Sequence, residues 1–290
     1  MDILNLQAFI YVSETSSFSR AAEQLFVTQP AVSKRIFALE HELGVPLFDR
    51  IGKTVQLTEA GQALLPSAKR ILAELEESRR AISNLSGTVS GKLKLGTSHH
   101  IGLHRLPPVL RRYTAEYPHV DLDIQFMDSE EACHGVIKGE LELAIATLPR
   151  QAEKNLTTRI IWHDPLGIAV GTDHPLAKRK TCTLTEVIKY PAILPSSGTF
   201  TRALLEQIPG LESGKLHIAM ETNYLETIKM MVSIGLGWSV LPISMISADM
   251  TVLKVRQFSM ERQLGVAYHT ERTLSNAAKK LLDQLSNISD

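Results

Sequence analysis

Residues 17–37, SFSRAAEQLFVTQPAVSKRIF, have the pattern of two short helices joined by a tight turn, and this stretch constrains the fold most strongly. Ser17 should cap the first helix, because its hydroxyl can accept a hydrogen bond from an unpaired backbone N–H of the opening turn. Thr28 should cap the second helix, and Pro30 lies in its first turn, where a missing N–H costs little. We therefore predict a pair of capped helices.

The second helix of this pair has an apolar side and a polar side. Phe26 and Val27 are expected to fill the turn before it. The apolar side has four residues at helical spacing that must be buried against a core: Val32, Ile36, Leu39 and Leu43. The opposite side presents hydrogen-bonding groups near the N-terminal end of the helix, followed by two cations.

Such a polar side suits a helix that enters the major groove of DNA by its N-terminal end. Gln29 can pair with adenine, and Ser33 can bond either kind of base edge. The cations are expected to contact phosphates, which hold the register without distinguishing bases. An ordinary helical hairpin with a solvated basic end is the alternative, which the motif alone does not exclude. The candidate DNA contacts of this helix are Thr28, Gln29, Pro30, Ser33, Lys34 and Arg35.

The flanking residues complete a small N-terminal domain. An amphipathic helix over residues 3–14 should pack behind the pair, and Gly44 should end the second helix. Residues 46–58 alternate in the manner of a hairpin, which we interpret as a wing. Arg50 and Lys53 at its tip are expected to contact phosphates or a minor groove, the alternative being a solvated hairpin tip.

A long helix is predicted from Thr58 to about Ser86. Pro66 should bend this helix. Its apolar residues alternate steps of four and three, which is a heptad seam: Leu64, Ala68, Ile71, Leu75, Ser78, Ile82 and Leu85. A single seam must be buried against something, and a second copy of the chain is the simplest partner. We therefore predict a homodimer, with packing against the same chain as the alternative.

Strand and helix patterns alternate after the linker at residues 86–91, which indicates a parallel α/β sheet. The segment 158–177 is expected to cross into a second unit with helices and strands of its own. The chain of 290 residues is long enough for two or three domains.

Composition narrows the class of protein only a little. The formal net charge is zero, so a DNA-binding role depends on where the cations lie rather than on their number. The start shows no secretory signal, no stretch approaches a membrane span, and Cys133 and Cys182 form no CxxC motif. We expect a cytoplasmic protein that has no membrane partner and no disulfide, and we leave a redox-sensing cysteine pair as the less favoured alternative.

With these residues in view, the chain resembles the LysR-type transcriptional regulators. The run FSRAAEQLFVTQPAVSKRIFALEHELGVPLFDR, followed by VQLTEAG, is close to the DNA-binding signature of that family. Later segments, LAIATLP, DHPLA and MMVSIGLGWSVLP, follow in the order of its effector domain. The resemblance covers nearly the whole chain.

The resemblance implies an α/β fold with three parts. These are a winged helix-turn-helix domain over 1–58, a dimerising linker helix and hinge over 59–90, and an effector-binding domain over 91–290. The last part should have two lobes, like the type 2 periplasmic binding proteins, with lobe I about 91–161 plus 268–290 and lobe II about 162–267. Many members of this family are tetramers, so a homotetramer is a further expectation.

Ligands of two-lobed α/β domains bind in the crevice beyond the carboxyl ends of the strands. Hydroxyls and free N–H groups near helix starts make anion sites there, so a carboxylate effector would fit. Each of these residues has an alternative role as a helix cap. The crevice and the resemblance together give the effector-binding candidates Thr97, Ser98, His99, Ser129, Thr147, Ser196, Thr199, Phe200 and Asn223.

Histidines 99, 100 and 104 raise the question of a metal, with Cys133 and His134 further along the chain. A zinc site needs at least three convergent ligands, and the sequence presents only two histidines that share a helix face. We therefore expect polar pocket lining, with no metal and no cofactor.

Three classes of function remain to be weighed. The first is a DNA-binding transcriptional regulator that responds to a small molecule. The second is a solute-binding protein with the same lobes, against which the capped, cationic N-terminal helices speak. The third is an enzyme, which we disfavour because no GxSxG, HExxH, GxGxxG or phosphate-binding loop is present.

Overall fold

The computed structural model describes residues 1–51, 54–85 and 87–287, and its internal contacts divide the chain into two units. Residues 1–86 belong to the N-terminal unit, with which residues 138–140 are also grouped, and the C-terminal unit contains the remaining residues. The N-terminal unit is built from α1 (Ile3–Thr15), α2 (Phe18–Gln24), α3 (Gln29–Leu43), β1 (Phe48–Ile51), β2 (Thr54–Leu57) and α4 (Glu59–Leu85).

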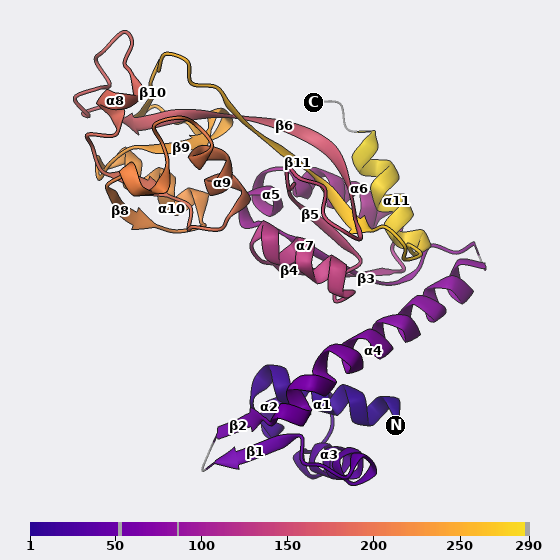
Figure 1. Cartoon of the computed structure of the whole chain (residues 1–290). Helices are drawn as coiled ribbons and strands as arrows, with labels where there is room; N and C mark the ends of the chain where they lie inside the picture. The colour runs from indigo at the N-terminus through magenta and orange to yellow at the C-terminus, as the bar shows by residue number, and fades with distance from the viewer. Residues whose placement is uncertain (52–53, 86, 288–290) are drawn as a thin grey trace. The chain divides into compact units, whose positions relative to one another are not determined.

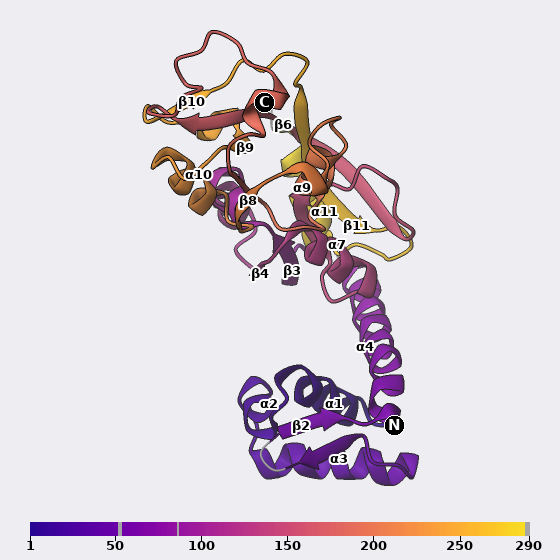
Figure 2. The same cartoon turned by 60° about the vertical axis from the view of Figure 1, so that its left-hand side comes forward.

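Three helices form the core of the N-terminal unit, and α3 lies along its outer edge (Figures 1 and 2). The apolar faces of α1, α2 and α3 meet in one cluster, to which Phe9, Phe18 and Ile36 contribute. Leu47 and Phe48 return the chain to this core after Gly44 ends α3 in a left-handed conformation, at φ 71°. The predicted helix pair and its burial pattern are therefore confirmed, except that Leu43 remains 38% exposed at the end of α3.

The two predicted caps differ in the structure. The Ser17 hydroxyl accepts a hydrogen bond from Arg20 N at 3.3 Å, as a capping residue does. Thr28 occupies the N-cap position of α3, but its exposed side chain makes no capping hydrogen bond. The prediction that Thr28 caps α3 is thus correct for its position and wrong for its hydroxyl.

The turn between α2 and α3 is filled by one residue rather than two. Val27 is half-buried against the helical core. Phe26 is in the left-handed region at φ 54°, and its side chain is 95% exposed. The prediction for Phe26 is wrong because the left-handed backbone at this residue turns the ring toward solvent.

The wing and the long helix follow in order. Strands β1 and β2 pair antiparallel, with Phe48 opposite Leu57. Helix α4 continues through Pro66 as one element. The first two residues of the predicted seam, Leu64 and Ala68, pack on the three-helix core, because this end of α4 lies against α1. The free part of the seam therefore begins at Ile71.

The C-terminal unit contains one seven-stranded sheet and one small sheet. The large sheet has the strand order β10-β6-β11-β5-β3-β4, with β9 also paired to β6. Its elements are β3 (Gly91–Thr97), α5 (His99–His104), α6 (Leu106–Glu116), β4 (Val120–Phe126), α7 (Ser129–Lys138), β5 (Leu143–Thr147), β6 (Leu156–Gly171), β9 (Ser239–Pro242), η2 (Ile243–Met245), β10 (Met250–Val252), β11 (Met260–His269) and α11 (Asn276–Ser286). The small sheet and its helices are α8 (Leu184–Val187), β7 (Ala192–Leu194), α9 (Phe200–Glu206), η1 (Ser213–Lys215), β8 (Ile218–Glu221) and α10 (Leu225–Ser233).

The prediction of a parallel sheet needs a correction. Strand β3 pairs parallel with β4 and β5, as the alternating pattern indicates. Strand β11, however, pairs antiparallel with both β5 and β6, so the large sheet is mixed. Strands β6 and β11 are long and carry the chain between two cores. They therefore do not follow the βαβ pattern of β3, β4 and β5.

The two cores define the lobes, and β6 and β11 pass from one to the other (Figure 1). Lobe I has a core that includes Trp162, Leu264 and Val266, whereas Leu166 and Met260 belong to the core of lobe II. The chain thus enters lobe II between 162 and 166 and leaves it between 260 and 264. The boundary that the sequence analysis placed at 268 lies inside β11. The composition of this uninterrupted strand does not change at the point where the strand passes from one core to the other, so the sequence does not reveal that point.

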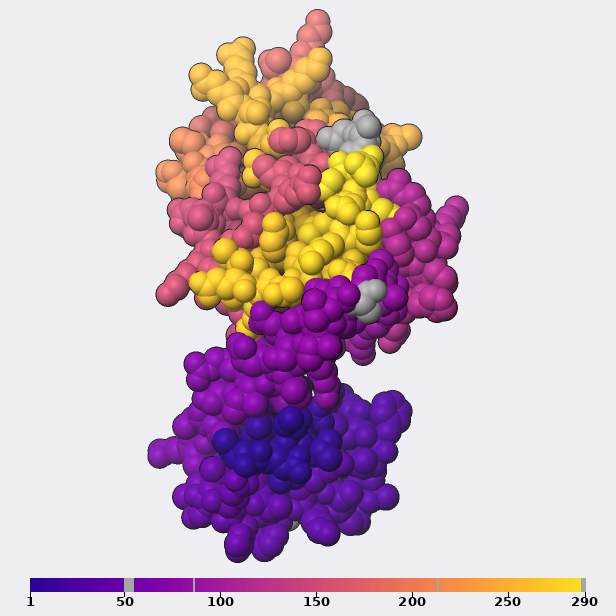
Figure 3. Space-filling model, turned by 90° about the vertical axis from the view of Figure 1, so that its right-hand side faces the viewer, coloured from indigo at the N-terminus to yellow at the C-terminus, as the bar shows by residue number. Residues whose placement is uncertain are grey.

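The last helix covers part of one surface of lobe I. Its apolar side packs into the lobe I core through Ala278, Leu281 and Leu285, while the yellow atoms of this part of the chain remain visible from outside in Figure 3. Within the described residues, no helix is both long and apolar enough to cross a membrane.

Candidate functional sites

The polar side of α3 is exposed in the N-terminal unit. Gln29, Pro30 and Lys34 are exposed, and Ser33 and Arg35 are half-buried. Val32 and Ile36, on the opposite side, are fully buried. The helix therefore presents hydrogen-bonding groups and cations outward from its N-terminal half, because its apolar stripe is held in the core.

The outward groups are only partly engaged with one another. Gln29 Nε2 donates a hydrogen bond to Ser33 Oγ at 2.9 Å. Neither Lys34 nor Arg35 takes part in an ion pair among residues 1–51, 54–85 and 87–287. These four side chains lie near the start of one helix. The two cations can contact phosphates, and the amide and hydroxyl groups can contact base edges.

The predicted wing contacts are only partly described. The backbone of Arg50 lies in β1, opposite Val55. Lys53, the other predicted contact, lies outside the described residues.

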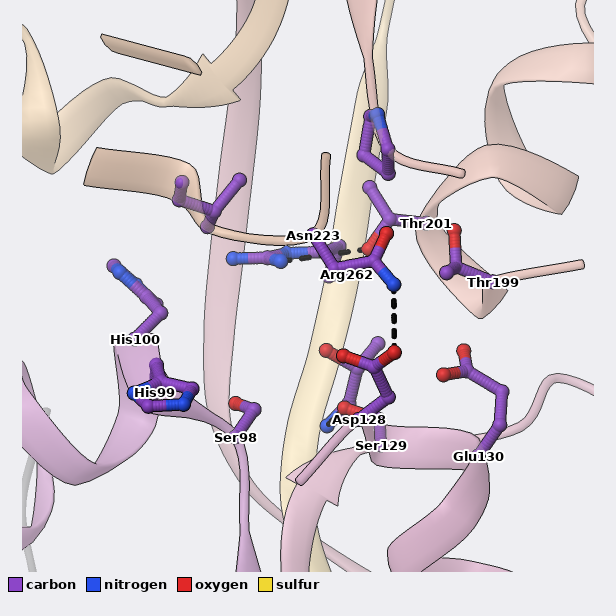
Figure 4. Close-up of a pocket in the computed structure, with 13 residues that line it drawn as sticks. Ser98, His99, His100, Asp128, Ser129, Glu130, Thr199, Thr201, Asn223 and Arg262 are labelled. Atoms are coloured by element: carbon purple, nitrogen blue, oxygen red, sulfur yellow. Dashed lines mark hydrogen bonds between the residues drawn. The ribbon is translucent and has the colours of Figure 1, made fainter. Parts of the chain in front are cut away.

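A cleft between the two lobes forms the second candidate site (Figure 4). It encloses about 500 Å³, part of it open to solvent. Lobe I contributes residues at the starts of α5 and α7, lobe II contributes residues around α9 and before α10, and Arg262 projects from β11. The lining is Ser98, His99, His100, Asp128, Ser129, Glu130, Thr147, Pro195, Thr199, Thr201, Asn223, Leu225 and Arg262.

Six of the nine predicted effector-binding residues line this cleft. They are Ser98, His99, Ser129, Thr147, Thr199 and Asn223. Thr97 is fully buried and donates to the carbonyl of Ile145 at 2.8 Å, so its hydroxyl joins two strands of the sheet. Ser196 and Phe200 are absent from the lining. Their backbone N–H groups donate to Asn223 Oδ1, at 2.9 Å, and to Glu130 Oε1, respectively.

Some cleft hydroxyls also have structural partners. Thr199 Oγ1 accepts from Arg202 N at 3.2 Å and donates to the carbonyl of Ser196 at 3.0 Å, so it caps α9. Ser129 Oγ accepts from Thr147 N at 3.1 Å. Ser98, at the N-cap of α5, makes no side-chain capping bond and leaves its hydroxyl turned to the cleft.

Among the described residues, two carboxylates that line the cleft accept hydrogen bonds from the opposite lobe. Asn223 Nδ2 donates to Asp128 Oδ2 at 2.6 Å, as the dashed line in Figure 4 shows. The N–H of Phe200 donates to Glu130, whose pKa is raised by burial. Both carboxylates come from lobe I and both donors from lobe II, so these two hydrogen bonds are among the contacts that join the lobes.

A buried ion pair lies at the base of the cleft. Arg262 Nε and Nη2 both donate to Asp164 Oδ2, at 3.0 and 2.5 Å. Asp164 is 1% exposed and Arg262 is 5% exposed. Arg262 keeps Nη1 near Thr201 Oγ1, at 3.4 Å. Because the pair joins β6 to β11, it holds the Arg262 guanidinium at the point where both strands pass from one lobe to the other.

Sequence reasoning missed the charged part of this lining. Asp128, Glu130 and Arg262 belong to the cleft, yet none of them stands in a motif with a ligand-binding pattern of its own. Asp128 and Glu130 flank Ser129 at the start of α7, and this proximity was the one available signal. Arg262 lies far along the chain and reaches the cleft only because β11 returns through the sheet.

The three histidines of α5 occupy different surroundings. The ring of His99 packs between Phe126 and Tyr224, with centroid distances of 5.3 and 4.8 Å. Burial, together with the nearby Arg262 charge, lowers the pKa of His100 to about 4. His104 Nε2 lies 2.9 Å from an oxygen of Glu226, a carboxylate contributed by α10.

The two cysteines lie in separate cores. Cys133 packs in a cluster with Val136 and Leu148, whereas Cys182 belongs to the lobe II core. Both are free thiols, and burial raises the pKa of Cys133 to about 12 and also raises that of Cys182. This arrangement does not support the redox-sensing alternative, because reactive cysteines are exposed and have a lowered pKa.

Two family models match the chain. Residues 3–62 match the model described as bacterial regulatory helix-turn-helix protein, lysR family. Residues 86–288 match the model of the LysR substrate binding domain. The two matches correspond to the N-terminal unit with α3 and to the C-terminal unit with the cleft.

Curated relatives include transcriptional regulators. An HTH-type transcriptional activator, CmpR, from Synechocystis sp. is 30% identical over 284 residues, covering 96% of this chain and 93% of the relative. An uncharacterized HTH-type transcriptional regulator from Azotobacter vinelandii is 68% identical over 108 residues, which are 37% of this chain and 75% of the relative.

Solved structures of similar fold include two full-length proteins. A point variant of full-length OxyR from Pseudomonas aeruginosa gives a TM-score of 0.70 at 24% identity, covering 100% of this chain and 96% of that chain. CbnR complexed with its target DNA gives a TM-score of 0.67 at 22% identity, covering 98% and 99%. At these identities the likeness shows the fold alone.

Proposed function

We propose that this chain, which belongs to the LysR family of bacterial transcriptional regulators, contacts its operator bases with the exposed side of α3. It is a DNA-binding transcriptional regulator with an effector-binding domain. The observation that carries the proposal is the outward polar half of α3, opposite a fully buried apolar stripe. Its relatives are regulators, which favours this function over solute binding or catalysis, and such a regulator would act in the cytoplasm beside its DNA.

The proposed DNA contacts fall into two groups. Gln29, Pro30 and Ser33 lie at the N-terminal half of α3, where a recognition helix approaches base edges. Lys34 and Arg35 provide the charge for phosphate contacts, and we assign Thr28 and the wing residues Arg50 and Lys53 to the same phosphate group.

We propose that two copies of the chain pair through α4. Ile71, Ile82 and Leu85 are 39%, 70% and 86% exposed along one seam of this helix. Apolar residues at heptad spacing are buried when two helices coil around each other. A dimer would place two recognition helices on half-sites about one helical turn apart or a multiple of it. The family resemblance extends this proposal to a dimer of dimers.

The proposed effector is a small carboxylate that also carries an amino group. Arg262 Nη1 and the hydroxyls of Ser98 and Ser129 can bind a carboxylate. Asp128 and Glu130, in the same cleft, would repel a simple anion and would attract an ammonium group. The mixed charge therefore supports a zwitterion over the simple carboxylate that the sequence favours.

The effector would act by shifting an equilibrium between arrangements of the two lobes. A ligand shifts such an equilibrium only through different affinities for the two arrangements. Asp128 and Glu130 accept hydrogen bonds from lobe II. An ammonium group that competes for these carboxylates would exchange the lobe contacts for ligand contacts and thereby change the favoured arrangement.

DNA recognition can be tested by selecting binding sites for the full chain from a pool of random duplexes. We expect enrichment of a sequence with two related half-sites, and binding that weakens steeply as salt is raised. A pool that shows no enrichment even at low salt would overturn the proposed α3 interface.

The effector class can be tested separately by thermal shift. Matched sets of amino acids, the corresponding carboxylic acids and the corresponding amines would be added to the full chain. We expect the amino acids to raise the melting temperature most, and Ser98→Ala to reduce that shift, with the exposed Ser197→Ala as control. Equal shifts from the simple acids, or no shift in any set, would contradict the zwitterion proposal.

A further inference from the structure

The side chain of His100 is buried without a hydrogen-bond partner. It is 5% exposed, and neither of its ring nitrogens has a partner within the part of the chain that the structure describes. A polar atom that is buried without a hydrogen-bond partner destabilises the folded state, and most buried polar atoms in proteins have such a partner. We would therefore expect a bound species to interact with the ring nitrogens of His100.

Two further side chains of ligand type converge on this ring. His104 lies one turn later in α5, and its ring centroid is 5.0 Å from that of His100. Glu226 lies in the first turn of α10 and has Oε1 2.9 Å from His104 Nε2. One potential ligand atom from each of the three residues lies within 4.8 Å of the other two.

We propose that His100, His104 and Glu226 bind a divalent transition metal of the Zn²⁺ type, which joins lobe I to lobe II. Zinc takes imidazole nitrogen and carboxylate oxygen at ~2.0–2.2 Å, so tetrahedral ligand atoms lie roughly 3.3 Å apart. His104 and Glu226 are 48% and 39% exposed in their side chains, and small rotations of these two can bring the set to that spacing.

The chemistry of the three ligands selects the class of metal. Two imidazoles and one carboxylate suit zinc and its neighbours, whereas Mg²⁺ and Ca²⁺ prefer oxygen ligands throughout. Three protein ligands leave one position of a tetrahedral site open to water or to a donor atom of a ligand in the adjoining cleft. His100 and Leu225 line that cleft, so the two sites share a wall.

The surrounding charges are balanced before a metal binds. Arg262 and Arg105 lie nearby and would repel a cation. Both face Asp164, with Arg262 Nε 3.0 Å from Oδ2 and Arg105 Nη2 3.9 Å from Oδ1. Together with Glu226, these two cations and two anions sum to zero, so the site carries no net positive charge when empty.

A metal at this position would add a second input to the regulator. His100 and His104 belong to lobe I, while Glu226 belongs to lobe II, so one ion would tie the two lobes together. Binding that requires all three ligands stabilises the arrangement in which they meet. The three proposed metal ligands are distinct from the residues that we assign to the operator contacts.

The site can be tested by isothermal titration of the full, chelator-treated chain with Zn²⁺ and, in parallel, with Mg²⁺. We expect one Zn²⁺ per chain and no binding of Mg²⁺. His104→Gln and Glu226→Gln should each lower the Zn²⁺ affinity at least tenfold, and both variants should fold because both side chains are partly exposed. His134→Gln, an exposed histidine in α7, is the matched control and should bind as the parent does.

Two outcomes would overturn the site. Zn²⁺ affinity that is unchanged in His104→Gln would remove this residue from the ligand set, and an equal loss in His134→Gln would indicate surface binding only. The absorption spectrum of Co²⁺ added to the parent chain is a second measurement. A tetrahedral spectrum supports the site, whereas the weak spectrum of the hydrated ion contradicts it.

Discussion

Gln29 donates a hydrogen bond from Nε2 to the Ser33 hydroxyl at 2.9 Å, one turn further along α3. The two proposed base-contacting side chains therefore hold each other in position in the free protein. Ser33 Oγ can still donate its own hydrogen, and the side-chain oxygen of Gln29 can still accept a hydrogen bond. Contact with bases would use these remaining groups or replace the bond between the two side chains.

Ser33→Arg should lower operator affinity and leave dimerisation unchanged. The larger side chain should prevent α3 from approaching the bases closely, and the substitution removes the hydrogen bond between Gln29 and the Ser33 hydroxyl. Loss of one good base contact costs ~1–3 kcal/mol, or roughly 5- to 150-fold in affinity. A gel shift with the selected duplex measures the effect, and Ser197→Arg adds the same charge to the other unit as control. Unchanged affinity in Ser33→Arg would move the interface away from this side of α3.

Ile82→Glu should weaken the proposed pairing of two chains through α4. A carboxylate buried without a partner in an apolar seam costs on the order of 2 kcal/mol, and a dimer would contain two of them, so association should weaken by more than about 30-fold. Sedimentation velocity measures the change. Ser83→Glu places the same group beside the seam and should remain dimeric. If Ile82→Glu sediments as the parent does, the chains pair elsewhere.

Asp164→Leu should destabilise the C-terminal domain by about 3–5 kcal/mol, because it leaves the Arg262 guanidinium buried and unpaired. Asp164→Leu with Arg262→Met should recover much of this loss. The two tryptophans, Trp162 and Trp238, both lie in this domain, so their fluorescence reports its unfolding in urea.

The exposed pair Lys280–Asp283 provides the control for this experiment, because its atoms are 3.8 Å apart and both side chains are well solvated. Asp283→Asn should change stability by less than about 1 kcal/mol. A loss in Asp164→Leu no greater than that of Asp283→Asn would show that the buried pair does not stabilise the domain.

Cys133 should resist alkylation in the folded protein. Its pKa of about 12 leaves on the order of one thiol in ten thousand as thiolate at pH 8, and the residue is 1% exposed. Mass spectrometry after treatment with iodoacetamide should find Cys133 modified only when urea is present. Rapid modification of the native chain at this residue would place the thiol in an accessible, reactive state.

The sequence predicted the N-terminal domain in some detail because its signals are local. Ser17, Gly44 and the stripe Val32, Ile36 and Leu39 each act on neighbours within one or two turns. The exposure of the Phe26 side chain was not predicted, because an apolar residue in a turn is normally expected to pack against the core. The left-handed backbone at this residue turns the side chain outward.

The point where the chain leaves lobe II and the charged lining of the cleft were beyond sequence reasoning for a common physical reason. Leu264 joins the lobe I core and Arg262 pairs with Asp164 because β11 returns antiparallel through the sheet. When two strands about a hundred residues apart pair with each other, the sequence of neither strand contains a pattern that reveals the pairing.

The sequence by itself thus determined the helix pair and its outward cations, since caps and helical periodicity depend on adjacent residues. The likeness of its longer motifs to those of one family pointed to the family. Only the tertiary structure decided which residues face one another across the cleft. It brought Asp128 to Asn223 and Glu226 to the histidines of α5, because contacts between lobes depend on where distant strands and helices meet.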